Sequence, residues 1–118
     1  MIDLKTLKDA DFHFMHGLVH LSAGRHREAL ECLVRALLLT KDEGQVRRSA
    51  SIVARLDALK SAKVWVYLAY GAIRSRARND AERERRFLIA ATRVAPEEES
   101  LFDRLAHLDG TRGKRGVA

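Results

Sequence analysis

The chain of 118 residues contains little of what interrupts helices or cross-links small folds. It has one cysteine, Cys32, and one proline, Pro96. A single cysteine excludes an internal disulfide, and scarce proline leaves few breaks inside helices. Aromatic residues make up only 6%, and no apolar run approaches the length of about 18 residues that a membrane-spanning helix needs. The N-terminal residues also lack the apolar region of a signal peptide, so the sequence predicts a cytoplasmic protein.

Helix-forming residues are abundant in what remains. Apolar residues account for 47% of the chain, which is enough for a folded core. Ala, Leu, Arg and Glu dominate, and all four favour helices. The composition therefore predicts an all-α fold. We expect a single helical domain over residues 1–109 and a basic, disordered tail over residues 110–118.

Apolar periodicity and turn signals divide the chain into about six helices joined by short connections. The predicted ranges are 10–22, 26–40, 45–58, 62–77, 80–94 and a last helix from Pro96 to Gly110. Asp9 or Asp11 is expected to cap the first helix, and Asn79 the fifth. Pro96 suits the first turn of the last helix, and Gly110 is expected to end it.

The stretch from Gly17 to Ala36 carries small residues at the spacing of two crossing helices. Gly17 and Gly24 are seven residues apart, and so are Ala29 and Ala36. Gly24 is expected to supply the turn between the helices, because glycine adopts the left-handed conformation without a steric penalty. Two helices cross closely only where side chains are small, so Gly17, Ala29 and Ala36 predict a tight helical hairpin.

This stretch resembles one tetratricopeptide repeat (TPR), a motif of about 34 residues. Besides the small residues, the resemblance rests on Leu33 and on the run Gly-Arg-x-x-Glu-Ala-Leu from Gly24 to Leu30. A fainter second register fits Gly71 or Ala72, Leu88, Ala91 and Pro96, with Glu84 at a position that the family gives to a small residue. The resemblance implies helical hairpins stacked as a short right-handed solenoid. It also implies a protein-binding surface and no chemistry.

Residues 12–50 further resemble the small TPR-type chaperones of bacterial type III secretion systems. The matching features are Phe12, Gly17, Leu21, Gly24, Ala29, the Ala-Leu-Leu run at 36–38 and Arg47-Arg48. This resemblance implies a cytosolic chaperone without ATPase activity. Such a chaperone would hold a small export substrate, or a component of the export apparatus, by a helix in an apolar groove.

Candidate residues for that groove come from two predicted helices. In a TPR hairpin the positions of Phe14, Leu18 and Leu21 face the concave groove, and further candidates are Tyr67, Tyr70 and Ile73. A groove of this composition suits an amphipathic helix of a partner protein. Two alternatives remain: the last helix fills the groove, or a second copy of the chain does, which would make the protein a self-associating module.

The net charge of +6 leaves a third function open, a basic adaptor that associates with nucleic acid. The cations that would form its basic patch are Arg74, Arg76, Arg78, Arg83, Arg85, Arg86, Arg112, Lys114 and Arg115. Asp80, Glu82 and Glu84 are interleaved with them, which favours a solvated helix face with ion pairs. The sequence contains no nucleic-acid-binding motif, so we treat this function as the alternative.

No residue pattern predicts catalysis, a cofactor or a metal ion. His13, His16 and His20 share one helix face, and either a metal site or titration at a partner interface is conceivable for them. The sequence offers no obvious further ligand, so we predict no metal site. Cys32 lies on an apolar stripe and is expected to be a small buried hydrophobe. No catalytic motif is present, and the prediction is a non-catalytic protein.

Overall fold

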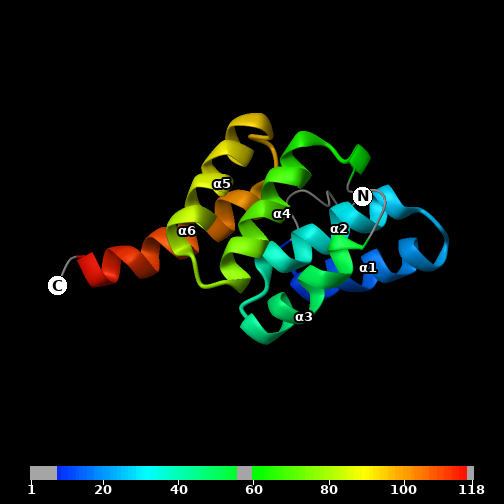
Figure 1. The fold of residues 1–118 in the computed structure, drawn as a ribbon, viewed down its shortest axis with the longest axis horizontal. Helices are drawn as coiled ribbons and strands as arrows, with labels where there is room; N and C mark the ends of the chain where they lie inside the picture. Colours follow the sequence, from blue (N-terminus) through cyan, green and yellow to red (C-terminus); the bar gives the residue numbers. More distant parts are fainter. Residues whose placement is uncertain (1–7, 56–59, 117–118) are drawn as a thin grey trace.

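The structure is a computed structural model that describes residues 8–55 and 60–116, apart from the side chains of Ala54 and residues 111–116. Within this part the chain forms helices and no strand (Figure 1). The helices are α1 (Ala10–Ser22), α2 (His26–Leu39), α3 (Glu43–Ala54), α4 (Val64–Ala77), α5 (Ala81–Val94) and α6 (Glu99–Gly116). The predicted all-α fold of about six helices is confirmed. The predicted end of the third helix, at residue 58, lies outside the described residues.

Side chains of aspartate cap the first and fifth helices, and the predicted cap of the fifth helix is replaced by its neighbour in the sequence. The Asp9 carboxylate accepts the backbone N–H of Asp11 at 3.0 Å, so Asp9 is the one of the two predicted candidates that caps α1. Asn79 does not cap α5; it ends α4 with a φ of 59°, a left-handed conformation that asparagine tolerates. Asp80 takes the capping role and accepts the backbone N–H of Arg83 at 3.1 Å. The prediction for Asn79 was wrong because the preceding helix needed a left-handed residue to end.

Both predicted limits of the last helix are wrong. α6 begins at Glu99, and Pro96 lies in the turn that precedes it. The buried Glu98 stands between them and is bound by Arg35 of α2, so tertiary contacts set the start of the helix. α6 then passes through Gly110 and reaches Gly116. A glycine inside a helix costs only about 1 kcal/mol, which is too little to stop it by itself.

The same three-helix unit occurs twice, with an offset near 55 residues. The left-handed residues Gly24 and Asn79 occupy equivalent turns, after α1 and after α4. In each turn a backbone N–H donates a hydrogen bond to the carbonyl of the residue five positions earlier: Arg25 to His20, and Asp80 to Ser75. The inward stripe Val46 and Val53 of α3 corresponds to Leu101 and Leu108 of α6. In Figure 1, α1 and α2 lie on one side of the molecule and α5 and α6 on the other, with α3 and α4 in contact between them.

Each unit contains one tight helical hairpin, and a glycine sits at each crossing. A Cβ atom on Gly17 would lie 2.8 Å from Leu33 of α2, and one on Gly71 would lie 2.7 Å from Phe87 of α5. Both glycines therefore let large side chains pack directly against the backbone of α1 or α4. The close crossing predicted at Gly17 and the turn predicted at Gly24, whose φ is 77°, are confirmed.

α2 is the central helix, because it packs against α1, α3, α4 and α6. Its apolar side chains form one core with those of the neighbouring helices. Two ion pairs join the two units: the buried pair of Arg35 of α2 with Glu98, and the pair of the buried Arg76 of α4 with the exposed Glu43 of α3. The stacking of hairpins as a right-handed solenoid stays a prediction.

Candidate functional site

The six predicted groove residues do not form one surface. Tyr70 and Ile73 are buried in the core of α2 and α4, so neither side chain can line an open groove. Phe14 is half-buried against the same core, and Leu21 is half-buried on α1. Only Leu18 and Tyr67 are exposed, and they lie on different helices. The tertiary structure thus separates the residues that the sequence analysis groups together.

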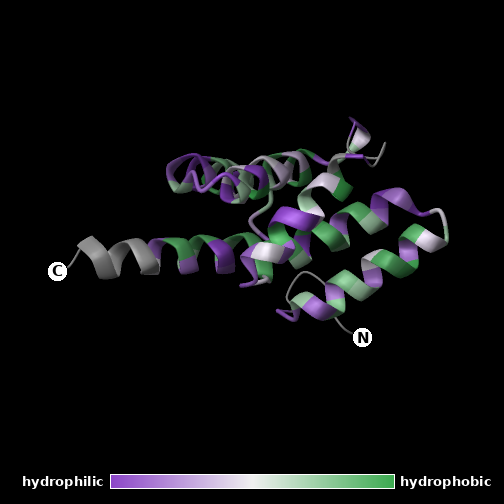
Figure 2. Cartoon of the chain, turned by 60° about the horizontal axis from the view of Figure 1, so that its bottom comes forward, coloured by the Kyte–Doolittle hydropathy of each residue, from purple (hydrophilic) through white to green (hydrophobic). Residues whose placement is uncertain are grey.

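A different apolar surface is present on α1. We call Met15, Leu18 and Val19 the outer face of α1, since they lie three and four residues apart on one side of the helix. Their exposed fractions are 67%, 45% and 60%. Apolar residues recur along the whole of α1, the helix that follows the N-terminus in Figure 2. Among the described helices, α2 is the main packing partner of α1.

Two arginines of the predicted basic patch form ion pairs within the protein, which leaves fewer cations available to a ligand. Arg76 is buried and bound to Glu43, and Arg85 Nε donates to Asp109 at 2.8 Å. Three exposed arginines, Arg74, Arg78 and Arg83, line a pocket of about 210 Å³. We call these three the arginine cluster. The side chains of Arg112, Lys114 and Arg115, also predicted in this patch, lie outside the described residues.

Helix geometry explains why Arg76 is separate from its neighbours in the sequence. Residues 74 and 78 are four apart and share a face of α4, whereas residue 76 lies on the other side of the helix. Gly71 and Phe87 form the apolar part of the pocket between α4 and α5, and Asp80 lines it too. The arrangement offers several guanidinium groups and one carboxylate to a ligand. It is suited to acidic groups and contains no nucleophile with an adjacent base.

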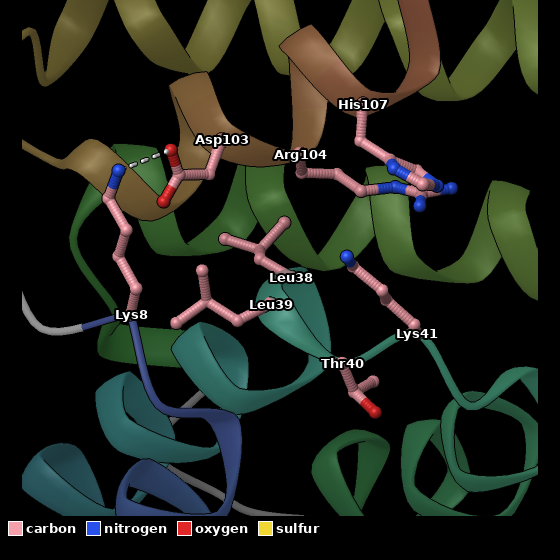
Figure 3. A pocket seen from close by; sticks show the side chains of 8 residues that line it. All are labelled: Lys8, Leu38, Leu39, Thr40, Lys41, Asp103, Arg104 and His107. Carbon is pink, nitrogen blue, oxygen red and sulfur yellow. Dashed lines mark ion pairs between the residues drawn. The ribbon is translucent and has the colours of Figure 1, made fainter. Parts of the chain in front are cut away.

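A second pocket, of about 270 Å³, lies between the end of α2 and α6 (Figure 3). The Lys8 ammonium points to the Asp103 carboxylate at 3.4 Å, and Lys41 extends toward Arg104. Arg104 is itself held by Glu84, with Nε 2.6 Å from Oε2. Most of the charge around this pocket is therefore already paired within the protein, which makes it a weaker candidate for a ligand site.

The three histidines of α1 have different environments. His13 is completely buried, whereas His16 and His20 are half-buried. Phe12 stacks on the His16 ring, with ring centroids 4.6 Å apart. His20 Nδ1 accepts a hydrogen bond from Arg25 Nε at 2.9 Å.

Cys32 of α2 lies beside two of these histidines. One ligand atom each of His16, His20 and Cys32 can be chosen so that all three lie within 4.8 Å of one another. Burial raises the pKa of the Cys32 thiol, and the nearby Arg35 only partly opposes this effect. The group was not predicted from the sequence, because Cys32 lies on a different helix from the two histidines. The spacing of His16 and His20 does place both on one face of α1, and the small Gly17 between them indicates that α2 crosses there.

Comparison of the chain with protein-family models, curated proteins and solved structures finds no match. Among the described helices, none combines the length and the apolar character needed to cross a membrane. Fold and surface define the chain as an all-α protein built from two similar three-helix units, with an exposed apolar face on its first helix.

Proposed function

We propose that the chain is a non-catalytic protein-binding module that holds an amphipathic helix of a partner against the outer face of α1. One observation carries the proposal: Met15, Leu18 and Val19 are exposed together on α1, whose main packing partner among the described helices is α2. Clustered apolar side chains of this kind mark interaction surfaces in proteins. An amphipathic helix suits them because its apolar stripe matches their spacing.

The size of this face limits what it can do alone. Fully burying an apolar side chain of this kind contributes roughly 1.5–3 kcal/mol, and the three are already partly covered. Covering the face therefore yields about 3–5 kcal/mol, which association costs largely offset. A stable complex also needs contacts with flanking groups, such as the half-buried Phe14 and Leu21 on either side of Leu18. Two of the predicted groove residues thus keep a role beside the outer face.

The narrower form of the proposal is a cytoplasmic type III secretion chaperone that delivers a small export substrate or export-apparatus component. Its basis is the resemblance of residues 12–50 to that family. Two features of the hairpin support it: Leu33 packs on Gly17, and Gly24 turns the chain with positive φ. The chaperone would hold its partner by contacts alone, without nucleotide hydrolysis.

Leu18→Asp is expected to abolish partner capture and leave the helix content unchanged. A carboxylate would have to be desolvated under the partner helix, so we expect affinity to fall at least tenfold. Capture is measured by co-purification from the native cell at equal bait concentration, and the helix content by circular dichroism. Val64→Asp is the matched control, because Val64 is exposed to a similar degree but lies on α4. Equal capture by wild type and L18D would refute the proposal.

Light scattering on the purified chain separates this proposal from self-association. A dimer that L18D converts to a monomer would mean that a second copy covers the outer face. A wild-type chain that is monomeric alone and binds one other protein supports the module for a different partner.

A second candidate function, binding of nucleic acid, is favoured by the arginine cluster. Replacing Arg74, Arg78 and Arg83 by glutamine is expected to weaken binding of a single-stranded oligonucleotide. The slope of log affinity against log salt should decrease in magnitude by about 2–3, because three phosphate contacts are lost. The control replaces Arg27, Arg48 and Arg93, which carry the same charge but do not line this pocket. Identical slopes for both triple variants, or no binding at low salt, would remove this function.

A further inference from the structure

Two helices bring three metal-ligand side chains together at one edge of the α1–α2 hairpin. His16 and His20 are four residues apart and project from the same side of α1. Cys32 comes from α2, which the turn at Gly24 folds back against α1. The candidate ligand atoms of the three side chains lie within 4.8 Å of one another.

The packing around the cluster holds these side chains in place. Gly17 lies between the two histidines in the sequence, and its missing side chain lets α2 approach the α1 backbone, with Leu33 in direct contact. Cys32, the residue before Leu33, is thereby brought to the level of the histidines. Phe12 stacks on the His16 ring, and the His16 and His20 rings meet edge to face with centroids 5.8 Å apart. The cluster is therefore built into the hairpin rather than formed by mobile surface side chains.

We infer that His16, His20 and Cys32 bind one divalent transition-metal ion of the zinc type, which clamps α1 to α2. Two imidazoles and a thiolate form the donor set that zinc prefers, whereas magnesium and calcium require oxygen ligands. The thiol proton leaves to solvent when Sγ binds the metal. Three protein ligands leave one tetrahedral position, which water can fill.

The required movement is small. Zn–N bonds of about 2.0 Å and a Zn–S bond of about 2.3 Å place tetrahedral ligand atoms roughly 3.3–3.6 Å from one another. The ligand atoms of the cluster, within 4.8 Å of one another, must therefore approach by about 1.2–1.5 Å at most. Rotation of the half-exposed histidine side chains supplies this movement without displacing either helix.

Arg25 competes with the metal for His20. A neutral imidazole has a single nitrogen with a free lone pair, and the Arg25 Nε–H group donates to His20 Nδ1 at 2.9 Å. If the metal binds Nδ1, it replaces Arg25 directly. If it binds Nε2, then Nδ1 must carry the proton and can no longer accept from Arg25. In both cases the hydrogen bond is lost, so Arg25→Gln should bind the metal at least as tightly as the wild type.

Titration of the full, untagged chain with Co²⁺ tests the site. We expect one equivalent to produce visible d–d bands of a four-coordinate ion and a near-ultraviolet band from thiolate-to-cobalt charge transfer. Zn²⁺ should displace the cobalt, and one equivalent of Zn²⁺ should raise the melting temperature, because it binds only the folded hairpin. Cys32→Ser is expected to lose the near-ultraviolet band. His16→Gln and His20→Gln should weaken binding at least tenfold.

His26→Gln is the matched control, because His26 is exposed at the start of α2 and is not part of the cluster. It should bind Co²⁺ like the wild type. Cys32→Ala accompanies the serine variant in case a buried hydroxyl disturbs folding, which circular dichroism reports. Absence of the charge-transfer band in the wild type would overturn the inference. So would a folded C32A chain with unchanged cobalt spectra, or equal weakening by H26Q and H16Q.

Discussion

Glu98→Gln is expected to lower the free energy of unfolding by about 3–5 kcal/mol, because it removes the hydrogen-bonded counter-charge of a buried cation. The Glu98 carboxylate is completely buried and accepts from Arg35 Nη2 at 2.6 Å and from Nε at 3.1 Å. Arg35 itself is almost fully buried, with its guanidinium 5.5 Å from the Trp65 ring centroid. The remaining carboxylate, Glu31, lies 3.9 Å from Arg35 Nη2, beyond hydrogen-bond distance, so it replaces only part of the lost interaction.

Urea unfolding followed by circular dichroism measures this loss, and two further variants define its origin. Arg48→Ala removes a pair with Asp42 whose side chains are both mostly exposed, and we expect a change below about 1 kcal/mol. The double replacement of Arg35 by Met and Glu98 by Leu removes both charges, so it should recover much of the stability lost in E98Q. A loss below about 1 kcal/mol in E98Q would contradict the buried pair.

Arg76→Ala is expected to lower the free energy of unfolding by about 2–4 kcal/mol, because Arg76 caps the end of α2 from another helix. Its Nη1 donates to the carbonyl of Leu37 at 3.1 Å, and its Nη2 donates to the carbonyl of Thr40 at 3.0 Å. Both carbonyls lie at the C-terminus of α2, where no backbone N–H remains to satisfy them. The guanidinium also binds Glu43, the first residue of α3. One side chain thus ties together α2, α3 and α4.

The exposed neighbour Arg78 provides the control for this prediction. It lies two residues further along the chain and carries the same charge, and Arg78→Ala should change the unfolding free energy by less than about 0.5 kcal/mol. Arg76→Lys keeps the charge but not the planar set of donors, so it should fall between the wild type and R76A. Equal stabilities of R76A and R78A would disprove the capping role.

Acid titration gives an independent signature of the same contact. Burial opposes ionisation of Glu43, yet the hydrogen bonds and charge of Arg76 outweigh it and hold the pKa of Glu43 below its ordinary value. A carboxyl group with a lowered folded-state pKa stabilises the protein above its unfolded pKa of about 4.3 and loses this contribution as pH falls through the folded pKa. The difference in stability between the wild type and R76A should therefore narrow below about pH 4.3. A constant difference down to pH 3 would contradict this coupling.

The sequence could not predict which of the clustered arginines are buried and which line a pocket. Arg74, Arg76 and Arg78 are chemically alike and nearly adjacent, yet Arg76 is buried while the other two line a pocket. Helical spacing already places residue 76 on another face, but it cannot say which face meets α2. That depends on how α4 packs against a helix about 40 residues earlier in the chain.

The apolar groove candidates separate into buried and exposed residues for the same reason. Tyr67, Tyr70 and Ile73 share a helical stripe, and the structure buries the second and third but exposes the first. On α1, Leu18 is exposed together with Met15 and Val19, whereas the predicted groove residues Phe14 and Leu21 are half-buried. An apolar residue is equally compatible with a core and with a binding surface, so only the position of its neighbours decides.

The sequence alone predicted the all-α fold, the approximate helix ranges and the turn at Gly24, and it offered Asp9 or Asp11 as the cap of the first helix. These depend on periodicity and on hydrogen bonds within a few residues, which local sequence controls. The tertiary structure was needed to show which arginines are buried and which face of α1 is exposed. It was also needed to show that Cys32 lies close to His16 and His20. Each of these requires side chains from different helices to come together, and the helix crossings that place them depend on close packing such as that of Leu33 on Gly17.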